Sequence, residues 1–152
     1  MEANAMRLGN YFNWRAGDSP DEGYTERWES SDYEELEKFP ERFRSITISE
    51  EWLSKFGFEK PVLSYNLNIS KNTFLQLAYC NDKGKGEYYA MITQDEDIIS
   101  MPKRVFYVHE LQNLYHALTG LELETKWDST LPIALYAEDR KNKVAKTTQK
   151  GE

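Results

Sequence analysis

The sharpest hydrophobic pattern in the chain covers residues 48–57, where apolar side chains recur three and four positions apart. This spacing places them on one face of a helix. The stripe consists of Trp52, Leu53 and Phe56. Ser49 stands where an N-cap accepts a hydrogen bond from a free backbone amide, and Gly57 supplies the left-handed residue that ends a helix. The pattern predicts a two-turn helix with a buried face.

A second amphipathic helix is predicted over residues 108–119. Gly120 comes directly after it and acts as a C-terminal stop. The apolar side chains of this segment form one broad stripe, as expected for a helix that packs on a core. The stripe consists of Val108, Leu111, Leu114, Tyr115 and Leu118.

Between these helices the hydrophobic period changes to two, which is typical of strands. Residues 62–69 alternate between apolar and polar, and residues 73–80 are rich in strand formers. Residues 87–93 form a third such run, after a turn that contains Gly84 and Gly86. The three runs predict an antiparallel meander.

Three further stretches predict short strands, at residues 7–14, at residues 105–107 and at residues 131–137, the last at the edge of the sheet. All the elements together predict the α+β class: a small antiparallel β-sheet packed by two short amphipathic helices, plus an acidic helical segment. No internal repeat at a fixed period is visible.

Length and composition favour one compact domain, because a chain of 152 residues can bury a sizeable core. We expect this domain over residues 1–137. Residues 138–152 contain no aromatic residue, so we expect a flexible basic tail there. The basic residues of the tail are Arg140, Lys141, Lys143, Lys146 and Lys150.

The single cysteine, Cys80, excludes an internal disulfide framework. At the end of a predicted strand, its ordinary role is that of a small buried hydrophobic residue rather than a nucleophile. No apolar run approaches the roughly 20 residues that span a bilayer, and the N-terminus lacks the pattern of a signal peptide. We therefore expect a cytoplasmic protein.

Residues 17–41 hold ten carboxylates against two basic residues, a charge of −8, whereas the whole chain carries −7. Ser19 and Pro20 resemble a helix start, the spacing from Ser31 to Glu34 repeats such a signal, and Pro40 ends the second of these segments. One or two short acidic helices are expected. A solvated face is the ordinary interpretation of such a run.

The sharper interpretation is a docking surface, in which spaced acids with interleaved aromatic rings imitate a nucleic-acid strand. Such a surface would bind a partner protein with a basic groove. The residues expected to contact the partner are Glu22, Tyr24, Glu26, Trp28, Glu29, Tyr33, Glu34 and Glu35.

No catalytic, metal or cofactor motif is complete. His109 and His116 are seven residues apart, or about 10 Å along a helix, so one metal ion cannot bridge them. Asn113 stands where a zincin motif has its second histidine. The segment Gly84–Gly86 lacks the frame of a phosphate loop, and a hairpin turn accounts for its glycines. We therefore predict neither a metal nor a cofactor.

Three segments, Arg7–Asn10, Ile48–Phe58 and Tyr107–Gly120, together resemble a family of small uncharacterised bacterial proteins associated with prophages and mobile elements. The resemblance covers about a quarter of the chain and is most specific in the third segment. It implies a mobile-element context and a small α+β domain, and it transfers no site residues. Residues 17–41 and the chain beyond Leu123 lie outside it.

Three functions remain open from the sequence. The first is a non-enzymatic phage or prophage protein that inhibits a host defence nuclease or another nucleic-acid-binding protein through its acidic surface. The second is a small hydrolase or transferase with a site assembled from scattered residues, for which the candidates are His109, His116, Asp95 and Glu96. The third, direct nucleic-acid binding through the basic tail, ranks last.

Overall fold

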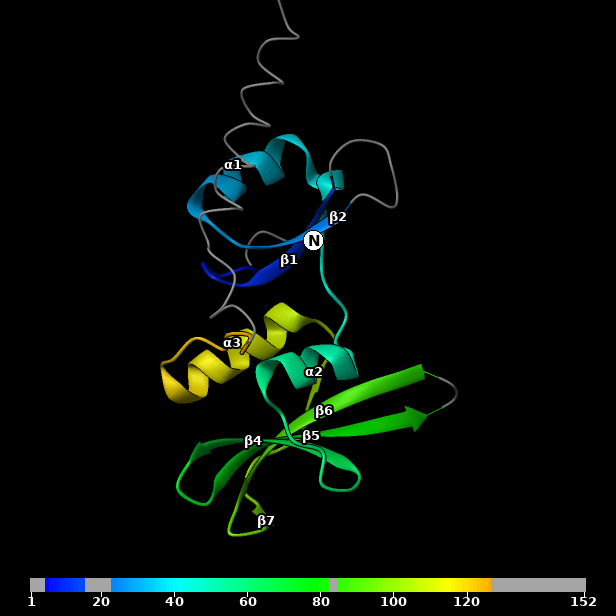
Figure 1. Ribbon diagram of the computed structural model, residues 1–152, viewed down its shortest axis with the longest axis vertical. Helices are drawn as coiled ribbons and strands as arrows, with labels where there is room; N and C mark the ends of the chain where they lie inside the picture. The colour runs from blue at the N-terminus through cyan, green and yellow to red at the C-terminus, as the bar shows by residue number, and fades with distance from the viewer. Residues whose placement is uncertain (1–4, 16–22, 83–84, 127–152) are drawn as a thin grey trace, which may run out of the picture.

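A computed structural model describes residues 5–15, 23–82 and 85–126 (Figure 1). Its N-terminal part contains β1 (Tyr11–Arg15), β2 (Gly23–Arg27), α1 (Ser30–Lys38), the 3₁₀ turn η2 (Pro40–Arg42) and β3 (Phe43–Arg44). The rest contains α2 (Glu50–Phe56), β4 (Ser64–Ser70), β5 (Thr73–Asp82), β6 (Lys85–Gln94), β7 (Asp97–Ile98), β8 (Lys103–Val105) and α3 (Val108–Thr119). The α2 and α3 helices lie between the two groups of strands (Figure 1).

The N-terminal sheet has three antiparallel strands in the order β2-β1-β3. It forms a small aromatic core with α1, in which Phe12 stacks on Phe43 and meets the edge of Trp28. Met6 and Leu36 complete the buried cluster. Asp32 is the other buried side chain of α1 and accepts a hydrogen bond from the Glu29 amide at 2.6 Å, while most of the remaining side chains of the helix are exposed.

The second sheet has five strands, with β4-β5-β6-β7 in order and β8 paired to β6. The α2 and α3 helices cover one of its faces (Figure 1). The larger core lies between them and includes fully buried residues from the sheet and both helices. These are Leu53, Leu75, Leu77, Val108 and Leu111.

Local signals explain where the two central helices begin and end. The Ser49 hydroxyl accepts a hydrogen bond from the Trp52 amide at 3.4 Å, and Gly57 ends α2 with a φ of 84°. Gly120 ends α3 in the same left-handed region, with a φ of 73°. Both positions favour glycine because a Cβ atom there is strained.

Buried side chains from both parts of the molecule join them: Tyr11 of β1 packs on Trp52 and Phe56 of α2, and Gln112 of α3 bonds to the β1 backbone. Gln112 of α3 is fully buried and accepts a hydrogen bond from the Tyr11 amide of β1 at 2.8 Å. Its amide nitrogen donates to the carbonyl oxygens of Leu123 at 3.1 Å and Gly9 at 3.3 Å. The packing of the small sheet against α3 therefore depends on a satisfied polar contact.

The predicted α+β class is confirmed, as are the two amphipathic helices and the three-stranded meander. Two predictions were wrong. The strands form two sheets instead of one, and residues 23–27 are a strand where an acidic helix was expected. The second acidic helix is present as α1, which ends before Pro40. The strand expected at residues 131–137 and the basic tail lie outside the described residues.

None of the helices in the described ranges is both long and apolar enough to cross a bilayer.

Candidate functional site

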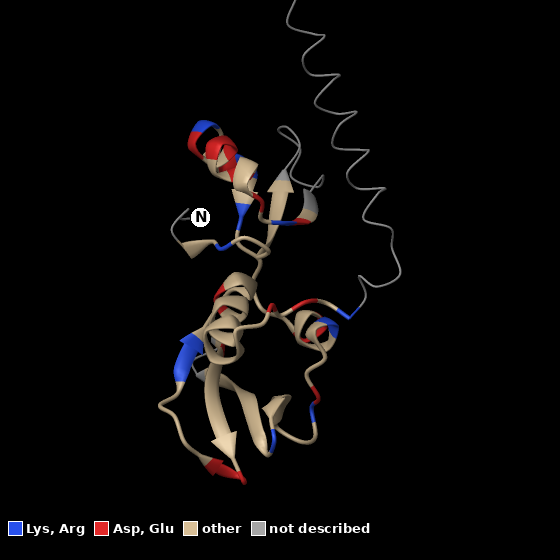
Figure 2. Ribbon diagram, turned by 90° about the vertical axis from the view of Figure 1, so that its left-hand side faces the viewer, with Lys and Arg blue, Asp and Glu red and all other residues tan. Residues whose placement is uncertain are grey.

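The outer side of α1 and η2 carries a row of carboxylates, which we call the acidic surface: Glu34, Glu35, Glu37 and Glu41. Three of these side chains are exposed and Glu35 is half-buried. Figure 2 shows the acidic residues of α1 at one end of the molecule. The opposite side of α1 packs Leu36 into the aromatic core, so the direction of the carboxylates is set by that packing.

The two basic residues within this stretch, Lys38 and Arg42, do not neutralise the acidic surface. Arg42 lies over the ring of Phe39 at 4.3 Å, and neither cation forms an ion pair with a carboxylate of the described residues. The ion pairs of the described chain lie on other elements. They include Arg7–Glu122, Arg27–Glu124, Lys55–Glu51, Lys60–Glu50, Arg104–Glu87 and His116–Glu122.

The structure separates the predicted contact residues into different environments. Trp28 is only 1% exposed and is held in the small core, so its expected role as an outward ring is wrong. Tyr33 is partly exposed, packs against Trp28 and donates a hydrogen bond to the Met6 carbonyl at 3.0 Å. Glu26 is half-buried and Glu29 is exposed.

The structure does not describe the side chains of two predicted contact residues. Glu22 lies outside the described residues, and Tyr24 is described only by its backbone in β2. Glu34 and Glu35 lie on α1 as expected. Among the predicted aromatic residues whose side chains are described, Tyr33 is exposed and Trp28 is buried.

The candidate catalytic residues are not brought together. His109 is 4% exposed and stacks on Tyr107, whereas His116 is exposed near Glu122 at 3.7 Å. Burial lowers the pKa of His109, and its Nδ1 atom has no hydrogen-bond partner among the described residues. Solvated or hydrogen-bonded histidines on the face of a helix were expected. His116 is exposed, but His109 is buried, and its Nδ1 atom does not form the expected hydrogen bond within the described ranges.

Asp95 and Glu96 lie at the turn between β6 and β7, at the end of the sheet remote from α3 (Figure 1). Cys80 is exposed, so the expectation of a buried thiol was also wrong. In the part of the chain that the structure describes, no three His, Cys, Asp or Glu side chains gather as a metal site would require.

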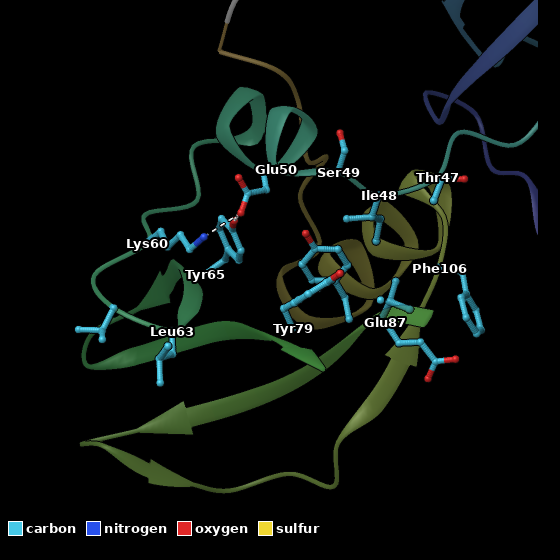
Figure 3. A pocket seen from close by; sticks show the side chains of 14 residues that line it. Thr47, Ile48, Ser49, Glu50, Lys60, Leu63, Tyr65, Tyr79, Glu87 and Phe106 are labelled. Carbon is cyan, nitrogen blue, oxygen red and sulfur yellow. Dashed lines mark hydrogen bonds and ion pairs between the residues drawn. The ribbon is translucent and has the colours of Figure 1, made fainter. Parts of the chain in front are cut away.

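A groove of about 790 Å³ opens between the N-terminal end of α2 and the β5–β6 hairpin (Figure 3). Tyr65, Tyr79 and Tyr88 form its aromatic floor, with ring centroids 6.1 Å apart for Tyr65–Tyr88 and 5.2 Å for Tyr79–Tyr88. Val62 and Leu63 line one wall and are 76% and 84% exposed. A cavity of this size falls in the range of ligand sites.

One charged pair lies at the α2 end of the groove. The Lys60 ammonium is 2.7 Å from the Glu50 carboxylate and 5.0 Å from the centroid of the Tyr65 ring, and the Tyr65 hydroxyl donates to the same carboxylate. The hydrogen bond from Lys60 lowers the pKa of Glu50, and the same bond raises the pKa of Lys60. Burial raises the pKa of the Tyr65 hydroxyl. Both charges are therefore retained near neutral pH, and neither group is suited to exchange protons there.

Sequence reasoning missed the groove. The alternating pattern extended the first strand of the meander back to Val62, whereas β4 begins at Ser64 and leaves Val62 and Leu63 exposed. Pro61 was the available signal, because it interrupts the run before the strand. Gly86 was another, since a Cβ atom there would collide with the ring of Tyr79.

Comparisons with protein-family models, with curated proteins and with solved structures find no match to this chain.

Proposed function

We propose that this chain is a non-enzymatic binding protein that docks on a basic protein surface through the acidic surface of α1 and η2. One observation carries the proposal: these carboxylates project from a packed core and have no ion-pair partner in the described residues, while ion pairs do form on other elements. Unneutralised charge on a rigid element steers association and favours a partner of opposite sign.

A nucleic-acid-binding protein is the partner class that fits best, because its substrate channel is basic and is shaped to receive a row of negative charges. The inhibition of a host defence nuclease by a phage or prophage protein is the specific form of this proposal. Its contact set is Glu29, Tyr33, Glu34, Glu35, Glu37 and Glu41. Trp28 is excluded from it by burial.

The proposal is tested by capturing the partner from a bacterial lysate and then measuring the affinity of the purified pair. The variant Glu34→Gln/Glu37→Gln/Glu41→Gln removes three charges from the acidic surface. We expect its association to slow at least about tenfold, and we expect the wild-type affinity to fall as salt rises.

The matched control removes three exposed carboxylates from the other half of the molecule, in the variant Glu59→Gln/Glu96→Gln/Asp97→Asn. Equal association by the two variants, or an affinity that salt does not change, contradicts the proposal.

A further inference from the structure

The β5 strand is longer than the strand that pairs with it on one side. It pairs with β6 over its whole length, from Thr73↔Gln94 to Asp82↔Lys85. Its pairing with β4 ends at Ser64↔Ala78. Residues 79–82 therefore extend past β4 with a strand partner on the β6 side alone among the described residues.

The hydrogen-bond alternation shows which backbone groups point to the open side. Asn66 exchanges backbone hydrogen bonds with Glu59, at 2.7 and 2.9 Å, so its N–H and C=O point away from β5. Its neighbour Tyr65 must then bond to β5, where it faces Leu77. Because the alternation has a period of two, Tyr79 and Asn81 direct their backbone groups the same way as Leu77.

A second contact on the far side of the sheet supports this assignment. Ile92 donates to the Ser100 hydroxyl at 2.7 Å and accepts from the Ile99 amide at 2.9 Å, so its backbone points away from β5. Leu75 faces Ile92 in the register and therefore also turns its backbone groups toward β4. The β5–β6 register is unbroken from there to Asp82, so the alternation carries through to Tyr79 and Asn81.

This edge of β5, which pairs with no strand of the described ranges, lies beside the groove. Tyr79 is 51% exposed and forms part of the groove floor, and Val62 and Leu63 line the wall where β4 would have continued (Figure 3). We propose that this edge binds an extended segment of a partner protein, which pairs with Tyr79 and Asn81 as an added strand and places alternate apolar side chains in the groove.

The chemistry of the site selects this occupant. Two alternate residues, Tyr79 and Asn81, offer N–H and C=O groups along the edge. This matches an extended chain and not a helix, whose own backbone groups are already bonded. The exposed apolar wall and aromatic floor select apolar side chains at every second position. The net charge of −7 and the Glu50–Lys60 pair leave no excess positive charge for an acidic segment, so the bound segment is neutral or basic.

This groove is a second binding surface that does not depend on the acidic surface of α1. The probe is a panel of capped heptapeptides, Lys-Val-Thr-Val-Thr-Val-Lys and versions in which the three valines are replaced together by Ile, Leu, Phe or Tyr. Each is titrated into the ¹⁵N-labelled full chain. We expect the amide signals of Tyr79 and Asn81 to move most. In an added strand, every second peptide amide points toward β5 and the others point away. We therefore expect N-methylation of the first set to abolish binding and N-methylation of the second set to leave it unchanged.

The variant Asn81→Pro removes an edge N–H without touching the bonds to β6, and Asn81→Ala is its control. Loss of one hydrogen bond predicts an affinity two- to tenfold weaker, on the order of 1 kcal/mol, for Asn81→Pro and little change for Asn81→Ala. The chemical shifts of β6 and α3 report whether the Pro variant stays folded.

Hydrogen exchange in the free chain completes the test. The Tyr79 and Asn81 amides should exchange rapidly and the Cys80 amide, which faces β6, slowly. Slow exchange of all three at any protein concentration means that the chain covers its own edge. Slow exchange only at high concentration means that a second copy does. Either result overturns the proposal. It is also overturned if no peptide of the panel shifts the amide signals of Tyr79 and Asn81, or if Asn81→Pro and Asn81→Ala bind the peptide with equal affinity.

Discussion

The two halves of the molecule differ in how much they bury and in what they expose. The N-terminal half is held by five buried residues, three of them aromatic, under a helix that carries unneutralised carboxylates. The C-terminal half buries residues from four of its strands and two helices, and several of its exposed charges are paired. The carboxylates thus lie on the part with the smaller core. Tyr11 of β1 packs into the larger core, but the other buried residues divide between the two, so we expect a substitution in either core to act first on its own half.

The largest expected effect is the loss of the small core alone. Phe12→Ala removes the ring that stacks on Phe43 and touches Trp28, and a buried Phe→Ala change costs about 3–5 kcal/mol. Because few other residues support that core, we expect amides of α1 to lose protection from hydrogen exchange while those of β5 keep it.

Leu77→Ala is the matched change in the larger core and should cost about 2–5 kcal/mol. It should lower the protection of β5 and α3 first. If Phe12→Ala instead lowers protection equally in both halves, the molecule is one cooperative unit and the separation is wrong.

Next in size is the polar contact of Gln112, one of those that join the halves. Gln112→Leu leaves the buried Tyr11 amide and Leu123 carbonyl without their partner, at a cost of roughly 2–4 kcal/mol in the free energy of unfolding. Gln112→Glu keeps the acceptor for Tyr11, but near neutral pH it buries a carboxylate whose second oxygen faces the Leu123 and Gly9 carbonyl oxygens, so we expect it to cost at least as much as Gln112→Leu there. At acidic pH the protonated carboxyl can donate, and the cost relative to Gln112→Leu should fall. Urea unfolding measures both variants, and a difference between their midpoints that does not change with pH contradicts this role.

A smaller effect is the pH dependence that comes from His109. Burial lowers its pKa below the ordinary value of 6.5, so the unfolded chain binds this proton more readily than the folded one. Stability is therefore complete above that value and falls as pH drops below it, by no more than about 1.4 kcal/mol per pH unit for one proton.

We expect His109→Phe to flatten the change in urea midpoint between about pH 7.5 and about pH 5.5, and the exposed His116→Gln to leave it in place. An unchanged slope in His109→Phe would show that other groups control stability in this range.

The smallest expected effect on stability concerns the acidic surface. Glu34→Gln/Glu37→Gln/Glu41→Gln changes exposed side chains without ion-pair partners in the described residues, so each substitution should alter the free energy of unfolding by less than about 0.5 kcal/mol. Thermal unfolding measures this directly. A large loss of stability would show that these carboxylates support the small core, and any loss of binding would then have a structural cause.

Elements that depend on neighbours a few residues apart were predictable from the sequence. The Ser49 cap, the glycine stops at Gly57 and Gly120, and the alternation of β5 and β6 each act within one or two turns or one hairpin. The concentration of acidic residues in one segment was equally plain. Its binding role stays a prediction.

Only the tertiary structure decided which side chains face inward and which gather at a site. In the sequence, Trp28 is one of several aromatic residues within an acidic segment. In the structure its ring packs against Phe12 and Phe43, and such burial depends on contacts between residues far apart in the chain. The groove required Leu63 and Tyr79 to line one cavity, at the point where β5 extends past Ser64, the first residue of β4. Strand length and pairing are set by the whole sheet, so Pro61 and Gly86 could mark breaks in the pattern but could not show that Leu63 and Tyr79 line the same groove.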